Sequence, residues 1–135
     1  MKNIYLALEV DGSEKPVIEQ AIQFSEKVGG TLTILHVNDL HAGEMSMMMD
    51  APKKVDEGNI REQLNAFGFN ELSQNINIII IASESIPQAI ADACTEADLL
   101  VLGHKRMSTF KSNLFDSIDE GIVNHVNCPV LVIQK

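Results

Sequence analysis

The stretch Asp98-Leu99-Leu100-Val101-Leu102-Gly103 is a short apolar run that ends in a glycine. A polar segment with Lys105, Arg106 and Lys111 follows, and Asp116-Ser117 then precedes an amphipathic stretch. A buried strand that delivers a glycine into a loop before a helix is how α/β proteins build a phosphate-binding site. This part of the chain therefore predicts an α/β fold with a candidate anion site after the strand.

Five apolar or β-branched runs along the chain have the length and composition of strands. They are Asn3 to Leu8, Thr31 to Val37, Ile76 to Ala82, Asp98 to Leu102 and Pro129 to Ile133. Between them, apolar residues recur with helical spacing in Val17 to Val28, Ile60 to Phe67, Ile86 to Ala93 and Leu114 to Val126. Alternating strands and helices predict right-handed crossovers and one parallel sheet with helices on both faces.

Local signals refine these elements. Ser13 is expected to cap the first helix, and Gly29-Gly30 to end it. Asn38 to Lys54 lacks periodicity and is expected to form a long loop. The nearly continuous isoleucines of Ile76 to Ala82 predict a strand that is covered on both faces.

Composition narrows the function. The chain has 135 residues, expected to form one domain over residues 1–135, and a formal net charge of −9. That charge argues against DNA, RNA and anionic membranes as partners, because all three select basic surfaces. The longest apolar run, Ile78 to Ala82, is far too short to span a bilayer, and the acidic start does not resemble a signal peptide. We therefore expect a soluble, cytoplasmic protein.

Four segments taken together resemble the universal stress protein family: Ile4 to Glu14, Thr31 to Val37, Ala97 to Gly103 and His125 to Val132. The resemblance implies a Rossmann-like, adenine nucleotide alpha hydrolase-like fold with strand order 3-2-1-4-5. It also implies a role in stress survival and a homodimer, and the lack of a recognisable catalytic arrangement favours a non-enzymatic role. The dimer contacts would fall on the last strand, at Val130, Leu131, Val132 and Ile133.

Members of that family that bind ATP carry a motif after the fourth strand: Gly, two residues, Gly, nine residues, Gly, then Ser or Thr. Gly103 and Ser117 match its ends, whereas Arg106 and Asp116 replace its second and third glycines. An acidic contact falls on Glu9 without gaps, or on Asp11 if the alignment shifts. The nucleotide contacts implied by the resemblance are Ala7, Leu8, Glu9, Val37, Leu102, Gly103, Arg106, Asp116, Ser117 and Ile118, with the adenine side at Ala7, Leu8, Val37 and Leu102.

The two departures from the motif act on the phosphates. A motif glycine lets the backbone approach a phosphate closely, and a side chain at Arg106 forfeits that approach. A carboxylate at Asp116, about 4 Å from a phosphate charge, is repelled by several kcal/mol. We therefore expect a degenerate nucleotide site that holds no cofactor. The alternative is an ATP-binding protein that switches with nucleotide, the cations of Lys105, Arg106 and Lys111 offsetting the repulsion.

Other hypotheses have less support. His41 and the methionines at 45 and 47–49 suit Cu(I), although packing on a groove or a partner is the favoured interpretation, and no metal site is predicted. A flavodoxin-like or electron-transfer flavoprotein-type domain would need aromatic side chains, and the chain has no Trp and one Tyr. His104 is expected as a partly exposed loop residue with no catalytic role, the alternative being a pH-sensitive ligand contact. Cys94 and Cys128 are expected as reduced structural thiols. No arrangement of residues predicts a catalytic centre.

Overall fold

The computed structural model describes residues 2–40, 54–104 and 117–135, with the backbone alone for residues 117–119. Five parallel strands form one sheet in the order β3-β2-β1-β4-β5. The strands are β1 (Asn3–Ala7), β2 (Thr31–Asp39), β3 (Asn77–Ser83), β4 (Leu99–His104) and β5 (Val130–Gln134). The expected sheet and strand order are confirmed.

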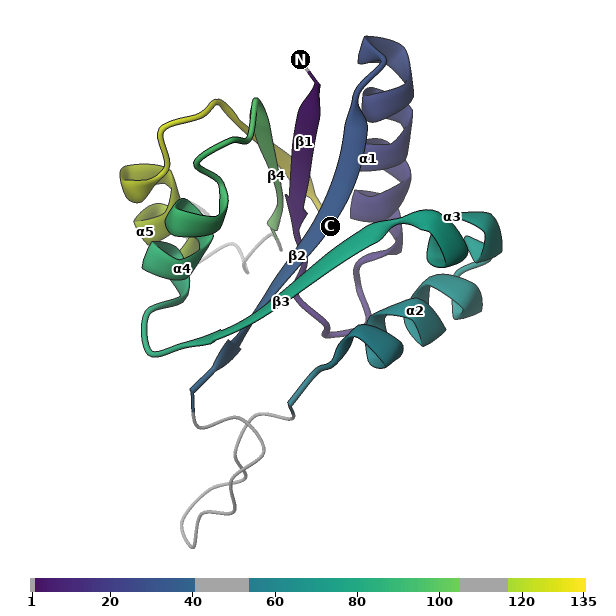
Figure 1. The fold of residues 1–135 in the computed structure, drawn as a ribbon, viewed down its shortest axis with the longest axis horizontal. Coiled ribbons are helices and arrows are strands. Elements are labelled where there is room, and N and C mark those ends of the chain that lie inside the picture. Colours follow the sequence, from purple (N-terminus) through teal and green to yellow (C-terminus); the bar gives the residue numbers. More distant parts are fainter. Residues whose placement is uncertain (1, 41–53, 105–116) are drawn as a thin grey trace, which may run out of the picture.

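Helices cover both faces of the sheet (Figure 1). On one face lie α1 (Lys15–Val28), α2 (Glu57–Ala66) and α3 (Asn70–Asn75), and on the other lie α4 (Ile86–Ala93) and α5 (Ser117–His125). This two-sided arrangement follows from right-handed crossovers, since β1 leads to β2 through α1 and β3 leads to β4 through α4.

Each face has its own apolar core. On the first face, Ile4, Leu6 and Ile34 from the strands pack with Ile18 of α1 and Ile60 of α2. On the second face, the strand residues pack with α4 and α5 in a cluster of Leu35, Val37, Ala89, Ile90, Cys94, Leu100, Leu102 and Ile122. The central strands supply both cores because successive side chains of a strand point to opposite faces.

The β3 prediction is partly wrong. Its isoleucines do contact both cores, Ile78 and Ile80 on one face and Ile79 and Ile81 on the other. However, β3 is an edge strand, and these four side chains are only half-buried. An edge strand has a neighbour on one side alone, so a continuous apolar run overstates its burial.

The start of α1 also differs from the prediction. The N-cap residue is Glu14, not Ser13, and no side chain caps the helix. Ser13 instead donates from its backbone N–H and its hydroxyl to Oδ1 of Asp11. Aspartate commonly stabilises a turn this way, and the turn delays the helix by one residue. Gly29 ends α1 with φ of 70°, as expected for a glycine after a helix.

Two further elements extend beyond the prediction. The loop was predicted to begin at Asn38, but β2 continues through Asp39. Asn38 and Asp39 pair with Ala82 and Ser83 of β3. The short helix α3 was not predicted. None of the helices in the described ranges is long and apolar enough to cross a bilayer.

Candidate functional site

A pocket opens at the carboxyl ends of β1 and β4, where the strand order reverses. In a parallel sheet this switch point is where ligands bind. The cavity encloses about 80 Å³. Its lining comes from all sides of the switch point: Ala7, Leu8, Glu9, Glu14, Val17, Leu35, His36, Val37, Ile86, Ile90, Leu102, Gly103, Ile122 and Lys135.

The interior of the pocket is apolar. Leu35, Leu102, Ile90 and Ile122 line it and also belong to the buried cluster on the second face of the sheet. They come from β2, β4, α4 and α5, so the pocket is a gap between the sheet and the two helices that cover it. Such a surface suits the flat face of an aromatic ring and offers few polar contacts.

Gly103 forms part of the pocket wall at a point of close contact. A Cβ built there would lie 2.7 Å from Val17 Cγ2 and 2.7 Å from Lys135 Cε. Contacts that short do not occur between real carbon atoms, so this position requires glycine while Val17 and Lys135 stay in place. The glycine serves the packing of α1 and of the Lys135 side chain against β4.

Lys135 lies at the mouth of the pocket. Its backbone N–H donates to the carbonyl of His104 at 2.9 Å, which continues the pairing of β5 with β4. Its side chain is 4% exposed, and its Nζ lies 3.3 Å from Glu9 Oε2 and 3.5 Å from Asp11 Oδ2. The two carboxylates, which are largely exposed, thus cover the ammonium. A buried lysine needs such partners, because desolvating a charge without one is costly.

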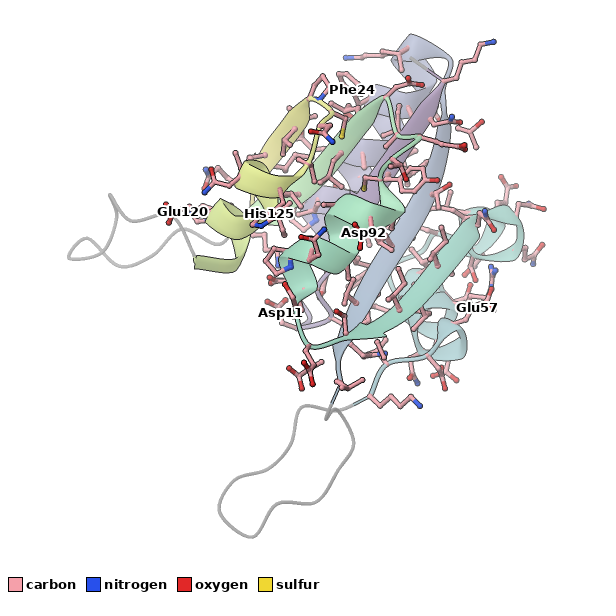
Figure 2. All side chains as sticks on the ribbon, turned by 60° about the vertical axis from the view of Figure 1, so that its left-hand side comes forward. Asp11, Phe24, Glu57, Asp92, Glu120 and His125 are labelled. Carbon is pink, nitrogen blue, oxygen red and sulfur yellow. The ribbon has the colours of Figure 1, made fainter. Side chains whose placement is uncertain are left out.

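The turn between β1 and α1 carries a buried carboxylate. Glu14 is 0% exposed, and its Oε1 accepts hydrogen bonds from the backbone N–H groups of Asp11 and Gly12. Its Oε2 accepts from Gln63 Nε2 of α2 at 3.2 Å. Figure 2 shows Asp11 in this turn, at the opposite end of the molecule from Phe24. The turn therefore directs its backbone donors to the protein's own carboxylate.

The two carboxyl groups of this turn have opposite pKa shifts. Burial raises the pKa of Glu14, against the hydrogen bonds from the turn. Burial also disfavours ionised Asp11, but the hydrogen bonds from Ser13 and the charge of Lys135 outweigh it and lower the pKa of Asp11 to about 2. At neutral pH, Asp11 is therefore the firmly ionised partner of Lys135.

We expect Glu14→Gln to change how stability depends on pH. A carboxyl group with a raised pKa binds more protons in the folded state, so its contribution falls as pH rises above the ordinary value of 4.5. The variant should lose that fall and unfold at higher urea than the wild type at pH 7. Its amide also gives Gln63 Oε1, which is buried and unpaired among the described atoms, a donor after an amide flip.

Urea unfolding at pH 4.5, 6 and 7.5 measures this effect. Glu19→Gln is the control, because Glu19 is an exposed carboxylate on the same helix. A wild type whose stability rises from pH 4.5 to 7.5 by the same amount as the Glu14→Gln variant would contradict the expectation.

His36 connects the pocket wall to the chain that follows β2. Its Nδ1 lies 2.7 Å from the carbonyl oxygen of Leu8, so Nδ1 carries a hydrogen and donates. Its Nε2 lies 3.2 Å from Oδ1 of Asn38, which is held by Val55: Asn38 Oδ1 accepts from Val55 N–H, and its amide donates to the Val55 carbonyl. The hydrogen bond to Leu8 and the contact with Asn38 give His36 a structural role.

The pocket brings together six of the residues expected to contact a nucleotide: Ala7, Leu8, Glu9, Val37, Leu102 and Gly103. Arg106 and Asp116 lie outside the described residues. Ser117 and Ile118 begin α5, and only their backbone is described. Glu9 and Asp11, the two candidates for the acidic contact, both face the Lys135 ammonium, and which of them contacts a ligand stays a prediction.

Sequence reasoning missed the other lining residues. Leu35 could have been found, because it pairs with Ala7 in the parallel register. Ile86 and Ile90 were expected only as a buried helix face, and Ile122 likewise. Nothing in the local sequence marked Glu14 or Lys135. His104 is partly exposed, as expected, but it ends β4 instead of lying in a loop.

The described residues offer little reactive chemistry outside the pocket. Burial raises the pKa of Cys94 to about 12, and it also raises the pKa of Cys128, so neither thiol is a nucleophile at neutral pH. Within the described ranges, no three His, Cys, Asp or Glu side chains gather as a metal site would need. The methionine segment considered for copper lies outside the described residues.

Comparisons with known proteins show the family and the fold of this chain. The universal stress protein family profile matches residues 1–134. A curated Staphylococcus aureus (strain USA300) relative, named as a universal stress protein, is 26% identical over 98% of this chain and 84% of its own length. The solved universal stress protein from Archaeoglobus fulgidus superimposes with a TM-score of 0.66 at 18% identity, covering 98% of each chain.

A second solved structure, a universal stress protein in complex with cAMP, has a TM-score of 0.61 at 17% identity and covers 99% of this chain and 98% of that one. These two structural matches establish the shared fold. The match of the family profile to nearly every residue establishes the family. The chain belongs to the universal stress protein family.

Proposed function

We propose that this chain is a non-enzymatic, cytoplasmic stress-response protein. We also propose that its pocket takes the adenine part of a ligand, and that the phosphates of such a ligand are bound weakly or not at all. The observation that carries the proposal is the pocket at the switch point, apolar inside and acidic at its mouth. A universal stress protein with the same fold has been solved in complex with cAMP, which supports an adenine-containing ligand for this chain.

The adenine half of the pocket is intact. Ala7, Leu8, Val37 and Leu102 line it, and they are the positions that the family resemblance assigns to the adenine side. An apolar slot between a sheet and two helices buries a flat ring well. The cavity of about 80 Å³ is smaller than the several hundred Å³ typical of ligand sites, so it suits part of a nucleotide.

The phosphate half is altered. Glu9, Asp11 and Glu14 put three carboxyl groups at or near the mouth, against one lysine among the described lining residues. Arg106 and Asp116 also replace two motif glycines in the sequence. Each feature disfavours a polyphosphate, so ATP should bind with a dissociation constant well above the micromolar range.

Calorimetric titration with MgATP tests this proposal. Micromolar binding would favour the alternative, a nucleotide-dependent switch. Mass spectrometry of the supernatant from denatured protein adds a second readout, because a tight nucleotide would co-purify. A visible absorbance band of the purified protein would instead indicate a flavin or another coloured cofactor.

We also propose a homodimer formed through β5. This strand is at the sheet edge, and Val130, Leu131 and Val132 are half-buried in the single chain. Val132 belongs to neither apolar cluster of the described residues. An apolar edge strand with unpaired backbone groups associates readily unless it is covered.

Val132→Lys is expected to shift the protein from dimer toward monomer, because a charged side chain on an edge strand opposes pairing. Light scattering should give twice the chain mass for the wild type and a lower mass for the variant at the same concentration. Gln74→Lys is the control, since it adds the same charge at an exposed position of α3 rather than on β5. A wild type that stays monomeric at high micromolar concentration would contradict the proposal.

A further inference from the structure

We infer that the Lys135 side chain fills the side of the pocket where a phosphate would bind. As a result, the pocket selects an uncharged adenine nucleoside over its phosphorylated forms. The inference rests on the proposed adenine site and specifies its ligand. It follows from three observations: the space over Gly103, the anchoring of Lys135, and the charges that face it.

The space over Gly103 is already filled. Gly103 is the one motif glycine that the described residues retain, and such a glycine lets a phosphate approach the backbone. Here the methylene chain of Lys135 covers it, since a Cβ on Gly103 would meet Cε at 2.7 Å and Cγ at 3.5 Å. A phosphate cannot reach the Gly103 backbone from this side while Lys135 holds its place.

Two kinds of contact anchor Lys135. Its backbone N–H bonds to the His104 carbonyl at 2.9 Å, which fixes where the side chain starts. Its ammonium reaches Glu9 at 3.3 Å and Asp11 at 3.5 Å. With its side chain 4% exposed, the lysine is far more buried than surface lysines normally are.

The charges disfavour a phosphate whether or not Lys135 moves. If the side chain swings out, it leaves the Glu9 and Asp11 carboxylates unpaired at the mouth, and they repel an anion. The same carboxylates accept hydrogen bonds from ribose hydroxyl groups, as acidic residues do in dinucleotide-binding folds. A nucleoside therefore gains contacts where a nucleotide meets repulsion.

Calorimetric titrations with adenosine, AMP and ATP test the selection. The wild type should bind adenosine at least about tenfold more tightly than AMP or ATP. Lys135→Ala, which clears the space over Gly103, should bind adenosine more tightly than the wild type while AMP stays weak. Lys135→Met keeps most of the side-chain volume without the charge, so its gain for adenosine should be smaller than that of Lys135→Ala.

Two results would overturn the inference. One is a wild type that prefers AMP or ATP to adenosine. The other is a loss of AMP affinity in Lys135→Ala, because that loss would make the lysine a phosphate ligand.

Labelling of lysines with isotopic acetic anhydride gives a readout that needs no ligand. Mass spectrometry should show Lys135 reacting at least about tenfold more slowly than the exposed Lys27, and Glu9→Gln with Asp11→Asn should remove that protection. Equal rates for Lys135 and Lys27 in the wild type would contradict the burial of Lys135 over Gly103. Protection of Lys135 without adenine binding in any variant would support the placement of Lys135 over Gly103 but overturn the ligand selection and the proposed adenine site on which it rests.

Discussion

Replacing Leu100 with alanine is expected to lower the free energy of unfolding by about 2 to 5 kcal/mol. Leu100 is 0% exposed and lies in β4, between Tyr5 of β1 and Val130 of β5. Its side chain belongs to the cluster that also forms the apolar interior of the pocket. The truncation removes apolar contacts and leaves a cavity that a closely packed sheet cannot fill by relaxing.

Urea unfolding at neutral pH measures the loss, which would be a large share of a total stability of about 5 to 15 kcal/mol. Val123→Ala in α5 is the control, because Val123 is 44% exposed and its truncation should change stability by less than about 0.5 kcal/mol. A Leu100→Ala variant as stable as this control would contradict the assignment of β4 as a buried central strand.

The strands were predictable because their physical signals are local. Each is a run of apolar or β-branched residues bounded by turn residues, and the alternation with helices dictates a parallel sheet. The end of β2 shows where local signals fail. Asn38 is polar, yet it stays in the strand because Val55, seventeen residues later, satisfies both ends of its amide.

The helix α3 was missed for a related reason. Its sequence, Asn70–Asn75, has no apolar periodicity over enough residues to predict a helix. It is stabilised instead by α2, because the Arg61 guanidinium donates to the carbonyls of Ser73 and Ile76. A hydrogen bond over that sequence separation leaves no local periodicity to detect. Short helices that depend on a tertiary contact are weakly stable alone.

Part of the pocket was predictable and part was not. The residues at the ends of β1, β2 and β4 follow from the topology, because the carboxyl ends of parallel strands meet at one edge. The position of Lys135 at the pocket could be predicted only from the register between β5 and β4. Gly103 pairs with Ile133 and His104 with Gln134, so the next residue falls at the pocket mouth. That register depends on packing across the whole sheet.

The proposed obstacles to phosphate binding come from two parts of the chain that can be tested separately. One is in the described pocket, where Lys135 covers Gly103 and pairs with Glu9 and Asp11. The other is in the sequence motif, at Arg106 and Asp116. The Lys135 side chain over Gly103 would hinder any ligand that occupies the mouth, whereas the pocket carboxylates and the motif departures would act only against the phosphates.

Asp116→Gly together with Arg106→Gly is expected to raise the affinity for ATP by at least about tenfold, or about 1.4 kcal/mol. The two changes restore the glycines of the motif and remove a carboxylate that the family resemblance places near the phosphates. Asp116→Gly alone should have a larger effect than Arg106→Gly alone, because losing the arginine also removes a cation. Calorimetric titration with MgATP measures the gain.

Adenosine is the matched control ligand, since its affinity should not change when only phosphate contacts are restored. Asp116 directly precedes α5, which begins at Ser117, so its loss should also lower thermal stability slightly through a missing helix cap. A double variant that folds, dimerises and still ignores ATP would show that the motif departures are not what limits binding. Adding Lys135→Ala to that double variant would then show whether the side chain over Gly103 sets the limit.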